Sequence, residues 1–161
     1  MSRRPIQFDC EGSALAGTLD VAGGSCGLLL VSGGNEIRSG SWAGQAQLAA
    51  RIAAAGHPVM RYDRRGIGDS AGDNAGFRGS EADIAAALGA FRGELPQMRR
   101  VVAFGNCDAA SALMLAGGRL GLNGLVLANP WVIEAGDEAV QAPAAIRQRY
   151  AQKLADPREW L

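Results

Sequence analysis

The sequence has little of what several protein classes require. It contains three cysteines and one histidine in 161 residues. The cysteines, Cys10, Cys26 and Cys107, are odd in number, far apart and without the paired spacing of metal ligands. This pattern argues against a disulfide framework and against a zinc site, so we expect reduced thiols and no metal.

The sequence also lacks blocks of one charge and long apolar runs. Sixteen basic residues balance sixteen acidic ones, and neither sign is concentrated, so we expect no nucleic-acid partner and no anionic membrane surface as partner. No segment approaches the roughly 18 apolar residues of a membrane span, and the two arginines near the N-terminus are not followed by the apolar segment of a signal peptide. We therefore expect a cytoplasmic protein without a membrane span.

Apolar segments with the pattern of strands alternate with segments that have the pattern of helices. This alternation predicts one α/β domain over residues 1–161. The 48% hydrophobic content suffices for one core. Alternating helices and strands predict a mostly parallel sheet with helices on both faces, preceded by an antiparallel N-terminal hairpin. Residues 132–161 are expected to begin a helical cap segment. The predicted strands are 5–12, 14–24, 26–34, 58–63, 99–105 and 122–130, and the predicted helices are 41–56, 80–95 and 107–118, with Ser41 and Ser80 as caps of the first two.

The segment GNCDAAS, residues 105–111, predicts a sharp turn from strand to helix with a thiol at its corner. Such a turn lifts its central side chain above the sheet edge and requires small residues on either side. The amide dipoles of a helix starting there would favour a thiolate, and the N–H of its first residue would face an oxyanion. The alternative is a compact buried cysteine that fills a crowded corner. The residues of the predicted elbow are Gly105, Asn106, Cys107, Asp108 and Ala109.

The segment RYDRRGIGDSAG, residues 61–72, follows the second strand of the predicted parallel sheet. It resembles the Y/F-D-x-R-G-x-G-x-S segment of the α/β-hydrolase fold. We expect structural roles here: Asp63 pairs with Arg65, Gly66 and Gly68 allow tight turning, and Ser70 satisfies backbone groups. Asp69 and Asp73 in the same loop could bind a substrate group, although loop carboxylates are usually solvated.

The segment VSGGNE, residues 31–36, follows the first parallel strand. It resembles the oxyanion-hole loop of the same fold, with SG or GG in place of HG. Glycines let backbone amides approach a bound carbonyl closely, so Gly34 or Asn35 would supply a second donor beside the Asp108 amide. The alternative is an ordinary glycine turn that ends a strand.

The three segments stand in the order of the α/β-hydrolase fold over about residues 5–131. The combination of the GG loop, the G-x-C-D-A-A-S elbow and the strand end LVLANPW resembles the exosortase A system-associated hydrolase 1 group. The resemblance implies a hydrolase that acts on an ester, thioester or related acyl bond of a small molecule, without a cofactor. Cys107 stands where most relatives carry serine, which is compatible with the chemistry because thiolates attack carbonyls well.

The acid and histidine that the family places after the nucleophile are missing before the chain stops at Leu161, so we expect a truncated or incomplete hydrolase. His57 precedes a strand and belongs at the opposite edge of the sheet, about 17 Å from the elbow, whereas proton transfer needs about 3 Å. The Asp108 side chain points in a different direction from its neighbour and is not expected to act as the base.

The residues are compatible with three functions to different degrees. The first is acyl transfer to Cys107 with slow turnover, since no base activates the deacylating water. The second is a non-catalytic binding module for an acyl or carbonyl ligand. The third, a nucleotide-binding domain, lacks the Walker lysine and the G-x-G-x-x-G pattern. The apolar strand 124–128 is expected at an open sheet edge, which predicts a homodimer or a complementary chain paired there.

Overall fold

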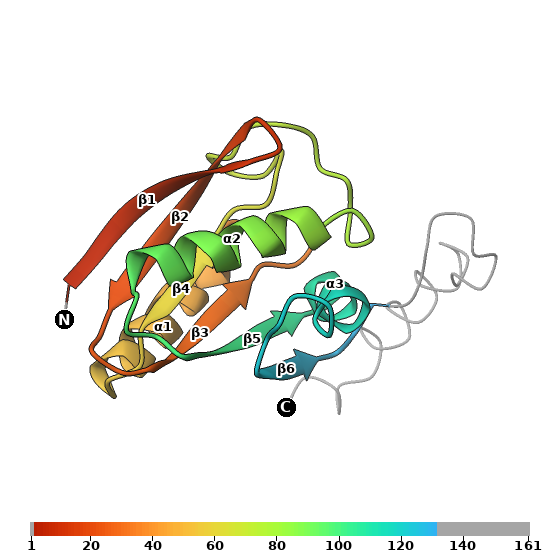
Figure 1. Cartoon of the computed structure of the whole chain (residues 1–161). Helices are drawn as coiled ribbons and strands as arrows, with labels where there is room; N and C mark the ends of the chain where they lie inside the picture. Colours follow the sequence, from red (N-terminus) through yellow and green to blue (C-terminus); the bar gives the residue numbers. More distant parts are fainter. Residues whose placement is uncertain (1, 132–161) are drawn as a thin grey trace, which may run out of the picture. The chain divides into compact units, whose positions relative to one another are not determined.

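The computed structural model describes residues 2–131 of the chain. Within this range, strands and helices alternate after an initial hairpin (Figure 1). The strands are β1 Ser2–Cys10, β2 Ser13–Val21, β3 Cys26–Val31, β4 Val59–Tyr62, β5 Arg100–Asn106 and β6 Gly124–Ala128. The helices are the short 3₁₀ helix η1 Ser41–Ala43 and the α-helices α1 Gly44–Ala54, α2 Glu81–Glu94 and α3 Asp108–Ala116.

The six strands form one mixed sheet in the order β1-β2-β4-β3-β5-β6. β1 pairs antiparallel with β2, and β2 antiparallel with β4, while β4, β3, β5 and β6 are mutually parallel along the sheet. This arrangement confirms the predicted fold class. Because the carboxyl ends of the four parallel strands meet at one edge, the loops that follow β3, β4 and β5 are brought together there.

A two-residue turn joins β1 to β2 within the predicted segment. Glu11 and Gly12 both have positive φ, 52° and 82°, and Cys10 pairs directly with Ser13. Two consecutive left-handed residues give the turn the twist of the flanking strands. The hairpin is therefore set by its own local sequence.

Two apolar layers cover the faces of the sheet. On one face, α2 and α3 contribute Ile84, Phe91, Ala109 and Leu113 to a core that also contains Leu29 of β3. On the other face, α1 packs through a smaller cluster. The members of that cluster are Leu30, Ala49 and Val59. Helices on both faces are what the alternation of buried strands and helices predicted.

Neither predicted serine cap is made. Helix α1 begins at Gly44, after a 3₁₀ turn, and Ser41 instead donates its backbone N–H to Glu36 Oε1 at 2.9 Å. Ser80 does occupy the N-cap position of α2, but its hydroxyl donates to the Gly76 carbonyl at 2.7 Å. Each serine hydroxyl instead donates to a group a few residues earlier in the loop before its helix: Ser41 Oγ to Glu36 Oε1 at 3.3 Å, and Ser80 Oγ to the Gly76 carbonyl.

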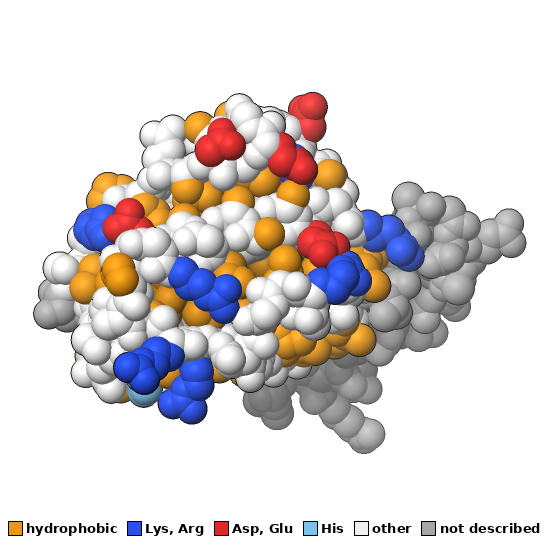
Figure 2. All heavy atoms as spheres, in the orientation of Figure 1, with side chains coloured by type: hydrophobic (Ala, Val, Ile, Leu, Met, Phe, Trp, Pro, Cys, Tyr) orange, Lys and Arg blue, Asp and Glu red, His pale blue; other side chains and the backbone are white. Residues whose placement is uncertain are grey.

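Strand β6 is the last strand of the sheet within residues 2–131, and the predicted cap segment 132–161 lies outside the described residues. Leu125, Val126 and Leu127 of β6 are exposed, so the expectation of a chain paired on this strand stays a prediction. On the face shown in Figure 2, acidic and basic side chains form small separate groups among apolar and uncharged ones. Within the described range, no helix has the length and apolar character to cross a bilayer.

Candidate active site

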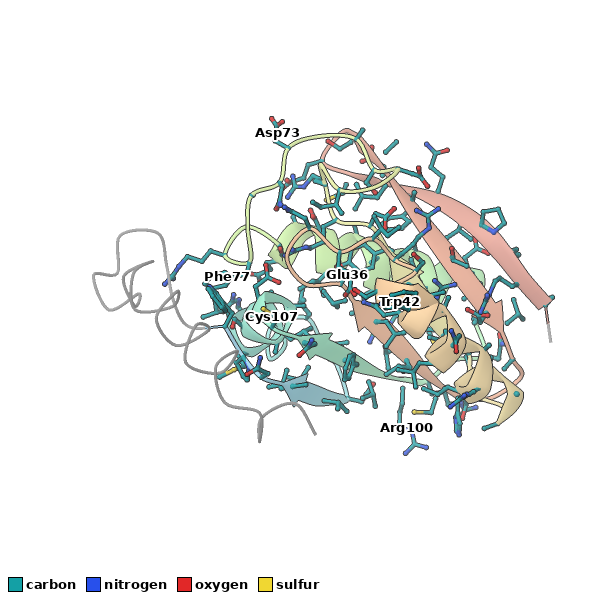
Figure 3. The ribbon with its side chains drawn as sticks, turned by 180° about the vertical axis from the view of Figure 1, so that it is seen from behind. Glu36, Trp42, Asp73, Phe77, Arg100 and Cys107 are labelled. Atoms are coloured by element: carbon teal, nitrogen blue, oxygen red, sulfur yellow. The ribbon has the colours of Figure 1, made fainter. Side chains whose placement is uncertain are left out.

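Cys107 lies at the corner between β5 and α3, as Figure 3 shows. Its backbone has φ 59° and ψ −128°, a conformation that non-glycine residues rarely adopt. A non-glycine residue in such a conformation is held there by its surroundings, and this is the backbone geometry of a nucleophile elbow. The sharp turn predicted for the GNCDAAS segment is therefore present.

The small residues around the corner are required by its geometry. A Cβ atom on Gly105 would lie 2.7 Å from the Ala109 carbonyl carbon and 2.8 Å from the Ala110 nitrogen. Both are backbone atoms of the first turn of α3, which cannot move as a flexible side chain can. Glycine at 105 thus lets the helix start directly over the end of the strand, as the spacing predicted.

Hydrogen bonds hold the Cys107 backbone on both sides. Its N–H donates to the Ala128 carbonyl at 3.1 Å, and its carbonyl accepts from the N–H groups of Ala110 and Trp131, each at 3.1 Å. The Cys107 side chain is partly exposed. Its Cβ lies 3.6 Å from the position that a Cβ on Gly33 would occupy. The Cβ atom that bears the thiol therefore lies beside the glycine loop after β3 and is not enclosed in the core.

The backbone amides predicted as oxyanion donors differ in whether another group of the chain already accepts their hydrogen. Asp108 is the first residue of α3, so no carbonyl within the helix accepts its N–H, and its predicted role as an oxyanion donor stays a prediction. The Gly34 N–H, in contrast, donates to Oδ1 of the Asp108 carboxylate at 2.5 Å. The Gly34 amide is therefore occupied in the structure described, and its predicted role as an oxyanion donor stays a prediction. The Asn35 side chain accepts from Asn74 Nδ2 at 3.3 Å, and the role predicted for the Asn35 amide stays a prediction.

The predicted pair between Asp63 and Arg65 was also wrong. The buried Asp63 carboxylate accepts from the backbone N–H of Arg38 at 2.6 Å and from the Arg38 guanidinium. Arg65 instead pairs with Asp83 of α2 and with Glu11 in the hairpin turn, each at 2.5 Å. The physical reason is that the chain leaves the strand at Asp63 and turns at Arg65, just before Gly66 with φ 70°. The Arg65 side chain therefore reaches α2 and the hairpin turn, while Asp63 reaches Arg38.

The other structural roles in this loop are confirmed. Gly66 and Gly68 have φ 70° and 55°, and a Cβ on Gly68 would lie 2.4 Å from the Asp63 carboxylate. Ser70 accepts from the Ala16 N–H at 2.9 Å and donates to the Asp63 carbonyl at 2.7 Å. The segment thus fastens the loop after β4 to β2.

Several other candidate groups do not reach the elbow. His57 is exposed, and its Nδ1 lies 3.2 Å from the Cys26 carbonyl oxygen, at the first residue of β3. That is the amino edge of the sheet, opposite Cys107. Asp69 pairs with Arg38 at 2.7 Å, and Asp73 lies at the outer end of its loop, well away from Cys107 (Figure 3).

The three thiols have different surroundings. All are free. Cys10 is buried, and burial, together with the nearby Asp83 carboxylate, raises the pKa of its thiol from 9.0 to about 11. Among residues 2–131, no three His, Cys, Asp or Glu side chains gather in a way that could hold a metal ion.

Sequence reasoning missed three charged residues that shape the site. Arg38 holds Asp63, Asp83 holds Arg65, and the buried Arg64 donates to both Asp108 Oδ2 and the Gly34 carbonyl. Arg64 follows Asp63 in the sequence, but nothing in the local pattern distinguishes it from a solvated arginine. Its role depends on Asp108, 44 residues further along.

An elbow at the end of a parallel strand, a glycine loop beside it and a D-x-R-G-x-G-x-S loop define an α/β-hydrolase fold. A family model described as "Alpha/beta hydrolase family" matches residues 28–161. The chain belongs to this alpha/beta hydrolase family.

Solved structures share the fold. Alpha/beta hydrolase GrgF from Penicillium sp. sh18 is 21% identical with a TM-score of 0.73, over 96% of this chain and 53% of GrgF. The esterase PF2001 from Pyrococcus furiosus is 16% identical with a TM-score of 0.71, over 80% of this chain and 49% of the esterase. XC6422 from Xanthomonas campestris, described as an α/β serine hydrolase without lid, is 19% identical with a TM-score of 0.64, over 79% of this chain and 61% of XC6422.

This chain therefore spans about half the length of the first two structures. A comparison with curated proteins gave no match. At these identities, the structural likeness establishes the fold, and activity is a matter for proposal.

Proposed function

We propose that this chain is the part of an acyl hydrolase that carries its nucleophile, and that the nucleophile is Cys107. The observation that carries the proposal is the strained backbone of Cys107 at the start of α3, with φ 59°. Strain of this kind persists where the surrounding structure enforces it, and it occurs often at active sites. Neutral esters and thioesters are the proposed substrate class.

The proposed reaction begins when the Cys107 thiol loses its proton to solvent and the thiolate attacks the carbonyl carbon of the ester. The C–S bond forms, and the negative charge moves to the carbonyl oxygen, where the Asp108 N–H is placed to meet it. The bond from carbon to the alcohol oxygen then breaks, and the alcohol leaves with the electron pair and takes up a proton. Water later hydrolyses the thioester to a carboxylic acid and the free thiol.

The second half of this reaction lacks a base among residues 2–131. The one histidine lies at the amino edge of the sheet, and Asp108 is engaged with Gly34 and Arg64. We therefore infer that this chain forms the thioester faster than it hydrolyses it, because an unactivated water is a poor nucleophile. We also propose that the chain belongs to the exosortase A system-associated hydrolase 1 group, because its elbow motif and its strand-end motif resemble those of that group.

One observation favours the alternative of a non-catalytic binding module. The Gly34 N–H is already satisfied by Asp108, so a carbonyl ligand does not find two free donors at the site. A binding module would hold an ester without consuming it.

The deciding experiment is mass spectrometry of the chain after treatment with p-nitrophenyl acetate at pH 7.5, combined with iodoacetamide labelling of each thiol. We expect Cys107 to be acetylated first and to retain the acetyl group. Cys10 should react slowly, since it is buried and the pKa of its thiol is about 11. Cys107→Ala should abolish the acetylation, and Cys26→Ala is the matched control that should not. If Cys107 is alkylated no faster than Cys26 and is not acetylated, the proposal is wrong.

A further inference from the structure

The amide of Gly34 is held by a carboxylate of the chain itself. Asp108 Oδ1 accepts from the Gly34 N–H at 2.5 Å, and the Arg64 guanidinium donates to the Gly34 carbonyl oxygen, also at 2.5 Å. The same Nη2 atom of Arg64 donates to Asp108 Oδ2 at 3.1 Å. Both backbone polar groups of Gly34 are thus held by a charged pair, Asp108 at the start of α3 and Arg64 in the loop after β4.

Arg64 is the fixed member of this pair. It is 2% exposed, and its Nη1 donates to Ser80 Oγ at 3.0 Å, whose hydroxyl is bonded in turn to the Gly76 carbonyl. The side chain of Asp108 is 15% exposed. Asp108 is therefore the more exposed member of the pair, and Arg64 is the more deeply held one.

The Asp108 carboxylate that accepts from the Gly34 N–H matters because it belongs to the residue next to the Cys107 thiol. Asp108 directly follows Cys107, and Gly33 packs beside the Cys107 Cβ, so a carbonyl oxygen brought to the thiol approaches the amide that Asp108 occupies. A negatively charged acceptor competes well for an N–H, since hydrogen bonds to charged groups are the stronger class. A neutral carbonyl has to displace it.

We propose that the Asp108 carboxylate is a gate on the oxyanion site: it holds the Gly34 amide in the resting protein and must leave for a carbonyl oxygen to bind there. The proposal rests on the function proposed above for Cys107. When the gate opens, Asp108 keeps its hydrogen bond to Arg64, and the Gly34 N–H joins the Asp108 N–H as the second donor for the developing oxyanion. The Asp108 side chain thereby opposes the reaction that its own backbone amide supports.

The experiment compares two reactions of the same thiol. Acylation by p-nitrophenyl acetate places negative charge on a carbonyl oxygen in the transition state, whereas alkylation by iodoacetamide displaces iodide at carbon and needs no oxyanion donor. Dividing the acylation rate by the alkylation rate cancels the effect that a lost carboxylate has on thiolate formation. For Asp108→Ala we expect this ratio to rise by about tenfold. Asp108→Asn, which keeps the shape and loses the charge, should raise it by less.

Asp73→Ala is the matched control, because it removes an exposed carboxylate of the same sheet edge away from Cys107 (Figure 3). Its ratio should equal that of the unaltered chain. A ratio that is unchanged or lower in both Asp108 variants overturns the gate, while acetylation of the unaltered chain leaves the proposed function standing. If Cys107 is alkylated but never acetylated in any variant, the proposed function fails and the gate fails with it.

A measurement on the unaltered chain guards against variants that do not fold. A trifluoromethyl ketone forms a hemithioketal with the thiol, and its oxygen is a stable mimic of the oxyanion. The gate predicts that this adduct shifts the ¹³C signal of the Asp108 carboxylate and the ¹⁵N signal of the Gly34 amide. An adduct that leaves both signals in place overturns the gate.

Discussion

Replacing Gly105 with alanine tests the geometry of the elbow most directly. The added methyl would lie 2.7 Å from the Ala109 carbonyl carbon and 2.8 Å from both its oxygen and the Ala110 nitrogen. Gly105 also pairs with Val31 of β3 and with Leu127 of β6. The strand therefore cannot retreat from the clash without disturbing neighbours on both sides, and α3 has to move instead.

The expected cost follows from two opposing effects. Inserting a methylene-sized group into a packed site costs about 1–3 kcal/mol, and replacing glycine in the unfolded chain returns about 0.4–1 kcal/mol. The free energy of unfolding should fall by up to about 2.6 kcal/mol, which lowers Tm by up to about 10 °C for a chain of this length. Because the methyl pushes the first turn of α3, the alkylation rate of Cys107 should also change.

The assay is thermal unfolding followed by circular dichroism, together with iodoacetamide labelling of Cys107. Gly93→Ala is the matched control: Gly93 lies inside α2 with open space where its Cβ would stand. That substitution should raise the free energy of unfolding by about 0.5–1 kcal/mol and leave Cys107 labelling unchanged. A Gly105→Ala variant that melts no lower than the unaltered chain, with unchanged labelling, would refute the argument from crowding.

Two further predictions concern buried groups. Asp63→Asn should lower the free energy of unfolding by about 2–4 kcal/mol, because the fully buried carboxylate has donors from Arg38 and from the Asp69 N–H. Asp69→Asn, which removes an exposed partner of Arg38, should cost about 0–1 kcal/mol in the same urea titration; equal losses would contradict the reasoning. The raised pKa of Cys10 means that the folded state binds this proton more tightly than the unfolded state. Its stabilising contribution is therefore complete below about pH 9 and is lost as the pH rises to about 11, and Cys10→Ala should reduce this slope in urea titrations across that range.

The elements near the site follow from residues that are close in sequence. The hairpin needs two left-handed residues between two strands, and Glu11 and Gly12 supply them. The elbow needs glycine two positions before its corner, and Gly105 stands there. Ser41 and Ser80 show the limit of such reasoning, because the Ser41 hydroxyl donates to Glu36 and the Ser80 hydroxyl to Gly76, and neither makes the expected helix cap.

The partners of the charged side chains depended on the packing of distant elements. Asp63 pairs with Arg38, 25 residues away, and not with its near neighbour Arg65. Asp108 binds the amide of Gly34, 74 residues before it. A carboxylate accepts from any donor that the fold brings within reach, so its sequence neighbours do not identify its partner.

The sequence by itself determined the order of strands and helices, the hairpin turn and the sharp corner at Cys107. These features rest on backbone sterics and apolar spacing, which act over a few residues. Only the tertiary structure decided that Arg64, Asp108 and Gly34 meet beside that corner. The reason is that the sheet order places β4 and β5 on the two sides of β3, and hydrogen bonds over such distances form only once that order exists.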